Sequence, residues 1–255
     1  MIDNPREYEI MAAVEARHWW YRTLHNLVLQ AIADHPAGRA ARILDAGCGT
    51  GGLLQTLGQA GYRSAQGFDL SLVAVSICNK HGLAVCQGDL ADITSIYAGQ
   101  TFDVIVSNDT LYHLPETART TFLRQAHDRL TPGGLLIMNL PALSMFRGQH
   151  DRAVGVTHRF SREELKQLLQ GTGFQTITSR YWPATLAPLI GLIRGWQRLT
   201  DRTDQTTRPK SDLKAEEGLL DRWINALLYK LVALEIRCIR SGPAASSLMT
   251  VLRRS

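Results

Sequence analysis

Short apolar runs alternate with longer mixed segments through the middle of the chain, from about residue 42 to residue 181. Runs rich in Val, Ile, Leu and Phe are typical of strands buried on both faces of a parallel sheet, whereas the mixed segments have helical spacing. A last apolar run, residues 247–253, is expected to pair antiparallel with the strand before it. The pattern predicts a doubly wound α/β sheet of seven strands. The other strands are expected around Ile43 and Leu44 and over residues 64–68, 83–87, 102–106, 135–140 and 174–181.

Glycine and proline mark the ends of the helices that this pattern predicts between the strands. Helices are expected over residues 52–59, 71–81 and 115–130, and the last of them should end in a turn at residues 131–134. Ser161 and Glu164 have the spacing of a capping box, which predicts a further helix that ends at Gly171.

Two segments outside this alternation also have helical spacing. Residues 7–33 contain the sequence EARHWWYR, and one side of this aromatic cluster is expected to pack on the core while another side covers a bound ligand. Residues 183–243 form an insertion with two predicted helices of wide apolar face, joined by a polar connection over 200–211. The predicted organisation is a helical cap over 1–40, a core over 41–182, the insertion over 183–243 and the last core strand over 244–255.

Three interpretations of the insertion stay open. Its apolar faces fit core packing or dimerisation, a lid over a hydrophobic acceptor, or contact with a membrane surface, where flanking basic residues would suit anionic headgroups. No apolar run is long enough to span a bilayer. The flanking basic residues are Arg194, Arg198, Arg222, Lys230 and Arg237.

Composition narrows the class of protein. With 255 residues and 45% hydrophobic residues, the chain can bury the core of one domain with additions. The net charge of +5 comes largely from arginines spread along the chain, so nucleic acid is not an expected partner. The 4 cysteines lack C-x-x-C spacing, and without a secretory signal the expected location is the cytoplasm. No metal site is expected, because no histidine–acid spacing matches a ligand set.

The most informative segment runs from Arg42 to Gly52, where a buried strand leads into a glycine-rich turn. Glycines let the backbone approach a ligand at the positive N-terminus of the following helix. Gly47, Gly49 and Gly52 also satisfy G-x-G-x-x-G, so these residues leave dinucleotide binding open. Asp45 stands at the mouth of the turn, where it can accept from an ammonium group or, through water, from hydroxyls. An acid there suits a cofactor that carries an amino acid.

Acids also follow the next two strands. Asp69 stands at the end of the second strand, 20 residues after Gly49, and its expected role is to accept from two ribose hydroxyls. Asp89 follows the third strand and can accept from an adenine amino group, while Leu70 and Leu90 sandwich the ring. In an open parallel sheet these strand ends form the edge where ligands bind.

Together these motifs resemble those of the class I S-adenosylmethionine-dependent methyltransferases. The segments ILDAGCGTGG, GFDLS, QGDL, FDVIVSNDTLYHL and LTPGGLLIMNLP occur in the family's order. The resemblance covers about residues 16–182 and the last strand, and a segment similar to HWWY precedes the first motif in many bacterial members. It implies a Rossmann-like methyltransferase sheet with S-adenosylmethionine as the cofactor.

The resemblance also implies roles for single residues. It assigns the ribose to Asp69 and the adenine to Asp89 and Leu90, in agreement with their positions after the strands. It further implies that Asn108 lies near the sulfonium and that the turn follows the methionine part through Gly47, Cys48 and Gly49. From the aromatic cluster, Tyr21 or Arg22 is expected to reach the methionine carboxylate.

The expected activity is methyl transfer to a small, hydrophobic metabolite, with O-methylation favoured over N- or C-methylation. For a phenol or hydroxyl acceptor, His113 after the fourth strand is the candidate base. Relatives often have Glu-His there, but this chain has Tyr112 in place of the acid, so His113 lacks an acidic partner. Two other classes stay open: a nicotinamide-dependent oxidoreductase and a non-catalytic partner subunit that binds the cofactor.

Overall fold

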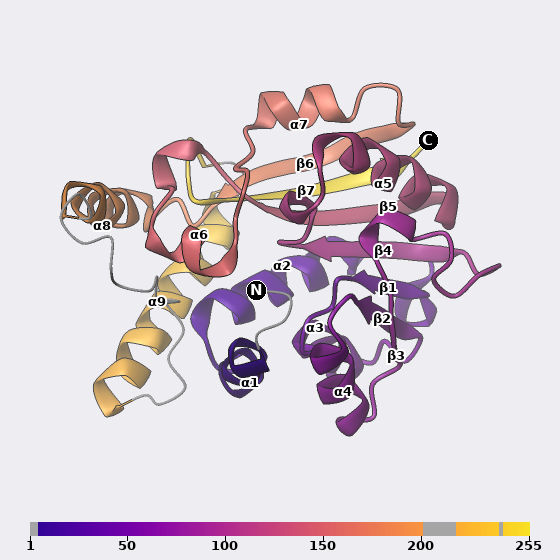
Figure 1. The fold of residues 1–255 in the computed structure, drawn as a ribbon, viewed down its shortest axis with the longest axis horizontal. Coiled ribbons are helices and arrows are strands. Elements are labelled where there is room, and N and C mark those ends of the chain that lie inside the picture. The colour runs from indigo at the N-terminus through magenta and orange to yellow at the C-terminus, as the bar shows by residue number, and fades with distance from the viewer. Residues whose placement is uncertain (1–4, 201–217, 240–241) are drawn as a thin grey trace.

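The computed structural model describes residues 5–200, 218–239 and 242–255, and a seven-stranded sheet forms its centre (Figure 1). The strand order is β3-β2-β1-β4-β5-β7-β6. Strands β1 to β5 pair in parallel, and β7 lies antiparallel between β5 and β6. The predicted doubly wound α/β sheet is thus confirmed. The strands are β1 (Ile43–Ala46), β2 (Ala65–Asp69), β3 (Val85–Gln87), β4 (Phe102–Asn108), β5 (Leu130–Pro141), β6 (Phe174–Trp182) and β7 (Ser247–Arg254).

Successive residues of each central strand face opposite sides of the sheet and enter two separate hydrophobic clusters. Leu44 and Ile105 belong to the cluster that continues into α5 (Glu116–Arg129) and α7 (Arg162–Leu168). Their neighbours Ile43 and Val104 belong to the second cluster, which continues into α2, α3, α4 and α9. Helices therefore cover both faces of the sheet, and the C-terminal ends of the strands remain as the place for a site. These four helices are α2 (Trp19–Ile32), α3 (Gly52–Gln59), α4 (Leu72–Lys80) and α9 (Leu219–Cys238).

Local signals placed most helix ends well. Ser71 caps α4 by accepting from the backbone N–H of Ala74. The predicted capping box forms at α7, where Ser161 Oγ accepts from Glu164 N at 3.1 Å and Glu164 Oε2 accepts from Ser161 N at 2.7 Å. The helix itself ends at Leu168, three residues before Gly171.

The helix predicted over residues 7–33 is interrupted, which corrects the expectation. It forms α1 (Pro5–Val14) and α2, separated by an extended residue, His18, whose ring accepts from Trp20 N. Asn225 of α9 fixes this break, because its Oδ1 accepts from Trp19 N at 2.7 Å and its Nδ2 donates to Arg17 O at 2.8 Å. The break was invisible in the sequence, since its partner lies about two hundred residues away.

The turn predicted at residues 131–134 lies inside the longer strand β5. The pairing shifts from Phe102–Leu130 to Val104–Leu135, so the extra residues bulge out of the sheet, with Gly133 at φ +78°. Beyond the sheet, the chain forms a short helix α6 (Gln149–Val154) and then α8 (Ala187–Thr200), which precedes α9. Most of the polar connection predicted over 200–211 lies outside the described residues. Among the helices that are described, none is long and apolar enough to cross a membrane.

Candidate active site

The glycine turn after β1 is held between the end of β2 and the loop after β4. The backbone N–H groups of Gly47 and Cys48 both donate to Phe68 O, each at 2.9 Å. Gly47 has φ +79°, and a Cβ atom there would lie 2.5 Å from Thr110 Cγ2. Only glycine fits this backbone. The turn therefore presents bare main chain at the C-terminal edge of the sheet.

Asp69 ties this turn to β2. Its Oδ2 accepts from Gly49 N and its Oδ1 from Ser71 N, both at 2.9 Å. Burial raises the pKa of Asp69, although the two backbone hydrogen bonds favour the charged form. A carboxylate oxygen can accept more than one hydrogen bond, so Asp69 can hold the turn and also accept from a ligand hydroxyl.

Asp45 and Asn108 lie at the C-terminal ends of the neighbouring strands β1 and β4. Burial, together with the nearby charges of Glu15 and Asp69, raises the pKa of Asp45 to about 8. The Oδ1 atom of Asn108 is buried and has no hydrogen-bond partner within the described parts of the chain. A buried acceptor of this kind is costly unless a donor reaches it, so the geometry fits a ligand with N–H groups.

The predicted adenine residues lie at the other end of the same edge. Asp89 Oδ1 caps a short 3-10 helix by accepting from Ala91 N at 2.8 Å. The next residue, Leu90, lies beside the turn, with Cδ1 at 3.4 Å from the position that a Gly47 Cβ would take. Leu70 keeps 41% of its surface exposed, an apolar side chain open to solvent at the edge of the site. The structure therefore brings these residues to one edge together with Asp45, Asp69 and Asn108.

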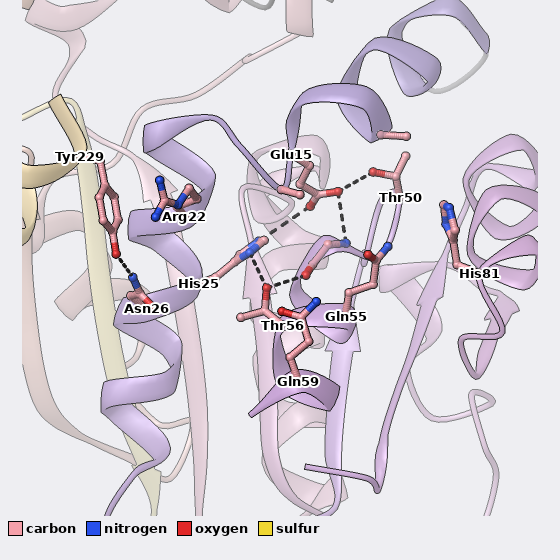
Figure 2. A pocket seen from close by; sticks show the side chains of 13 residues that line it. Glu15, Arg22, His25, Asn26, Thr50, Gln55, Thr56, Gln59, His81 and Tyr229 are labelled. Atoms are coloured by element: carbon pink, nitrogen blue, oxygen red, sulfur yellow. Dashed lines mark hydrogen bonds and ion pairs between the residues drawn. The ribbon is translucent and has the colours of Figure 1, made fainter. Parts of the chain in front are cut away.

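Glu15 lies at the N-terminus of α3, an arrangement that the sequence did not reveal (Figure 2). Its Oε2 accepts from Thr50 Oγ1 at 2.5 Å and from Gly52 N at 3.1 Å, and its Oε1 lies 3.8 Å from Nε2 of His25. Burial raises the pKa of Glu15 to about 7 and lowers that of His25 to about 4. A Cβ on Gly52 would collide with Glu15, so this glycine makes room for a helix cap from the N-terminal segment.

The structure separates the two residues that were predicted to reach the methionine carboxylate. Arg22 lines a pocket of about 240 Å³ between α2, α3 and α9, and its guanidinium carbon lies 3.9 Å from the centroid of the Tyr229 ring (Figure 2). Tyr21 is half-buried and lies elsewhere. Burial raises its pKa, and the charges of Glu15, Asp109 and Tyr112 raise it further. Tyr21 thus lies toward the loop after β4, whereas Arg22 lies toward α9.

Asp109, the residue after β4, is a second candidate that sequence reasoning missed. Its backbone has φ +52°, and its Oδ2 accepts from Asn139 Nδ2 at 2.8 Å. The Oδ1 of Asn139 accepts in turn from Trp182 Nε1 at 2.9 Å, which links the ends of β4, β5 and β6. Burial raises the pKa of Asp109 to about 7 against the opposing effects of Asn139 and Arg159. The polar loop was visible in the sequence, but its partners lie on two other strands.

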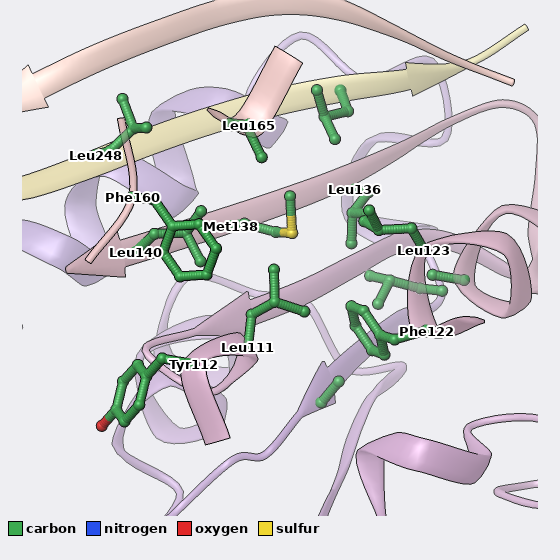
Figure 3. Close-up of a cluster of buried hydrophobic side chains, with 14 of the residues drawn as sticks. Leu111, Tyr112, Phe122, Leu123, Leu136, Met138, Leu140, Phe160, Leu165 and Leu248 are labelled. Atoms are coloured by element: carbon green, nitrogen blue, oxygen red, sulfur yellow. The ribbon is translucent and has the colours of Figure 1, made fainter. Parts of the chain in front are cut away.

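His113 lies in the turn before α5, directly after Leu111 and Tyr112. Those two side chains belong to the hydrophobic cluster shown in Figure 3. The His113 ring centroid lies 4.2 Å from that of Tyr112. Partial burial lowers the pKa of His113 below its ordinary value, so the ring is neutral at neutral pH. Across the described residues, no three His, Cys, Asp or Glu side chains are grouped so that they could hold a metal ion.

Comparison with known proteins places this geometry in context. A family model described as a methyltransferase domain matches residues 16–179. Phosphoethanolamine N-methyltransferase of Triticum aestivum is 28% identical over 146 residues, which are 54% of this chain and 28% of that protein. Ubiquinone biosynthesis O-methyltransferase of Pseudomonas paraeruginosa is 29% identical over 139 residues, 49% of this chain and 58% of that protein. The chain thus spans less than a third of the first relative and about three-fifths of the second.

Solved structures of similar fold are more distant in sequence. A putative sarcosine dimethylglycine methyltransferase from Galdieria sulphuraria aligns with a TM-score of 0.56 at 18% identity, over 92% of this chain and 84% of that one. Magnesium protoporphyrin IX methyltransferase from Synechocystis PCC 6803, solved with bound S-adenosylmethionine, aligns with a TM-score of 0.53 at 16% identity, over 92% and 79% of the two chains. At this identity the likeness concerns the fold.

Proposed function

The chain belongs to the class I S-adenosylmethionine-dependent methyltransferases, and we propose that it methylates a small, hydrophobic acceptor, most readily on oxygen. The family assignment sets aside the nicotinamide-dependent oxidoreductase and the non-catalytic subunit. At the site, the observation that carries the cofactor assignment is a bare glycine turn next to the buried Oδ1 of Asn108, which has no hydrogen-bond partner among the described residues. A ligand that brings N–H donors to the C-terminal edge of the sheet would satisfy that atom.

We propose that the cofactor lies along this edge from Leu90 to Tyr21. Asp69 would accept from the ribose hydroxyls, and Asp89 with Leu70 and Leu90 would hold the adenine. Gly47, Cys48 and Gly49 would follow the methionine part, whose ammonium group would lie near Asp45. Asn108, predicted to lie near the sulfonium, would also offer its buried Oδ1 to that ammonium group. Tyr21 would contact the methionine carboxylate of the cofactor. Arg22, the other candidate, stacks its guanidinium on Tyr229 instead.

The bound cofactor supplies an electrophilic methyl group, and the chain's own residues position the acceptor and exclude water. Placing the two reacting atoms at about 3 to 3.5 Å removes about 7 to 11 kcal/mol of the entropic barrier, so few acid–base groups are needed. A hydroxyl acceptor must also lose its proton. His113 is the base predicted from the sequence, and Asp109 is a second candidate because burial raises its pKa to about 7.

The acceptor is proposed to be hydrophobic because apolar side chains of α8 and α9 remain exposed beside this end of the sheet. The relatives' names include both an O- and an N-methyltransferase, so nitrogen acceptors stay in the test. We further propose the four-part organisation with a cap over 1–40, a core over 41–182, an insertion over 183–243 and a last strand over 244–255. The insertion would then act as a lid or as a contact surface.

Calorimetric titration tests the cofactor assignment first. The purified chain should bind S-adenosylmethionine and S-adenosylhomocysteine with micromolar affinity and should not bind NAD. A panel of hydrophobic phenols, acids and amines then tests the acceptor by formation of S-adenosylhomocysteine. Turnover of amines alone would contradict O-methylation, and turnover of polar acceptors alone would contradict a hydrophobic acceptor.

A further inference from the structure

The outer face of α9 carries a stripe of exposed apolar side chains. Leu220, Trp223, Leu227, Leu231 and Leu234 follow one another at steps of three and four residues, which places them on one side of the helix. Their exposed fractions are 71%, 77%, 57%, 42% and 60%. Soluble monomers rarely leave such a contiguous apolar surface in water, so this stripe indicates a contact surface.

The helix cannot turn to bury this stripe, because its opposite face is fixed. Val232 and Ile236 are buried in the second hydrophobic cluster. Asn225 accepts from Trp19 N, and the Tyr229 hydroxyl accepts from Asn26 Nδ2 at 2.8 Å. The stripe is therefore a stable feature of the surface.

The charges beside the stripe are mostly positive. Arg222, Lys230 and Arg237 are exposed, and Lys230 and Arg237 each follow a stripe leucine by three residues. Of the two acids of α9, Glu235 is buried and accepts from the backbone N–H groups of Ala184 and Thr185. Asp221 is exposed in the first turn and accepts from Gly218 N at 3.0 Å. The exposed side of α9 thus combines an apolar stripe with a basic flank.

Helix α8 also exposes apolar side chains at the same end of the molecule. Leu189 and Leu192 of α8 are 54% and 73% exposed. Figure 1 shows α8 and α9 at the end of the molecule opposite β3. The chain enters α8 from Trp182 at the end of β6, the edge at which Asn139 and Asp109 lie. A surface bound by these helices would lie beside the C-terminal edge of the sheet.

We propose that α9, assisted by α8, binds the surface of an anionic lipid bilayer. A helix with an apolar stripe and a flank of Lys and Arg lies in the membrane interface, with its apolar side inserted and its basic side chains at the headgroups. None of the described helices is both long and apolar enough to cross the bilayer. Two copies packed through the stripe would bring their basic flanks together, and like charges repel, so the charges favour an anionic lipid surface over a second copy. The inference goes beyond the proposed function and requires no particular methyl acceptor, although the hydrophobic acceptor was proposed from exposed side chains of the same two helices.

Flotation of the full chain with lipid vesicles tests this inference. Vesicles of phosphatidylcholine with phosphatidylglycerol should carry the protein upward, vesicles of phosphatidylcholine alone should carry much less, and added salt should weaken binding. The combined variant Leu220→Gln, Trp223→Gln, Leu227→Gln should abolish flotation. The pair Lys230→Gln, Arg237→Gln should weaken it about 30-fold, since each basic side chain near an anionic surface contributes about a factor of five.

A matched control replaces an exposed apolar residue elsewhere. Ile177→Gln on β6 alters a side chain of 43% exposure and should leave flotation unchanged. Titration with S-adenosylhomocysteine checks that each variant is folded. Flotation that survives the triple variant would overturn the proposal, as would its absence in the wild type. The proposal would also be overturned if the wild type formed a dimer, the triple variant were a monomer, and neither bound vesicles. The stripe would then be the contact surface for a second copy of the chain.

Discussion

Asp69 has two partners in the protein and a predicted third in the ligand. Replacing it by Ala removes its hydrogen bonds to Gly49 N and Ser71 N and the proposed bonds to the ribose. We expect Asp69→Ala to weaken S-adenosylhomocysteine binding by about 1.5 to 3 kcal/mol, the usual value for hydrogen bonds to a charged group. Calorimetry measures the loss. Asp69→Asn is the matched control, because its one carbonyl oxygen keeps part of the acceptor capacity. Its affinity for S-adenosylhomocysteine should lie between those of the wild type and Asp69→Ala. Unchanged affinity in Asp69→Ala would refute the assignment.

The two candidate bases differ in the pKa that each would give to the pH profile. A base acts when deprotonated, so kcat/KM rises as the pH passes upward through its pKa. Asp109 predicts a midpoint near the value of about 7 that burial gives it, whereas His113, whose pKa burial lowers, predicts a midpoint below its ordinary value. With a hydroxyl acceptor from the panel, we expect the midpoint near pH 7 that Asp109 predicts.

Two variants separate these candidates. Asp109→Asn keeps an acceptor for Asn139 Nδ2 and tolerates positive φ, so it should fold. It should lower kcat by about 100- to 10,000-fold and remove the midpoint near neutral pH. His113→Gln should leave that midpoint in place. A profile that moves only in His113→Gln would assign the proton to the histidine.

At the scale of an element, α3 depends on a cap supplied by the N-terminal segment. Burial raises the pKa of Glu15 from 4.5 to about 7, so between these values the native state binds more protons than the unfolded chain. Glu15 therefore lowers the free energy of unfolding as the pH rises from about 4.5 to about 7. Above that window the destabilisation no longer grows. Glu15→Gln keeps an acceptor for Thr50 and Gly52 but cannot ionise.

The difference between variant and wild type should therefore change with pH. We expect Glu15→Gln to gain about 1 to 3 kcal/mol relative to the wild type between about pH 5 and about pH 8, as urea unfolding would measure. Glu164→Gln is the contrasting control. The pKa of Glu164 is lowered through its hydrogen bonds to Ser161, so its replacement should bring no such gain. A constant difference for Glu15→Gln would show that the carboxyl titrates normally.

Sequence patterns predicted elements well where the signal was local. The capping box at Ser161 and the glycine turn at Gly47 are each signalled by residues next to one another in the sequence, and both form. Features that need distant partners were missed. The break between α1 and α2 depends on Asn225. The raised pKa of Asp109 depends on burial that outweighs its hydrogen bond from Asn139 on another strand. Periodicity shows which residues lie on one face, but it does not show what covers that face.

At the scale of the whole molecule, the insertion is continuous with the core. The inner face of α9 packs into the cluster that holds α2 and α3, through Val232 and Ile236. Trp20 of α2 also stacks on Trp182 of β6, with ring centroids 5.6 Å apart. Deleting residues 183–243 would therefore expose core side chains, whatever the role of the insertion. Surface variants of α9 test its role without that damage.

This continuity predicts that the described chain unfolds as one unit and that the cofactor stabilises all of it. S-adenosylhomocysteine at about 100 times its Kd should add about 2.7 kcal/mol. For a chain of this size that is a rise in Tm of about 5 to 10 °C. The Tm values from far-UV circular dichroism and from tryptophan fluorescence should rise together, because Trp20 and Trp182 lie where the helices meet the sheet.

Two controls test whether this rise comes from the cofactor site. NAD at the same concentration should change neither Tm, and Asp69→Ala should reduce the rise that both probes report. The prediction would fail if fluorescence changed at a lower temperature than circular dichroism and if S-adenosylhomocysteine did not raise that temperature. Such a result would show that α2 and α9 unfold independently of the cofactor-binding sheet.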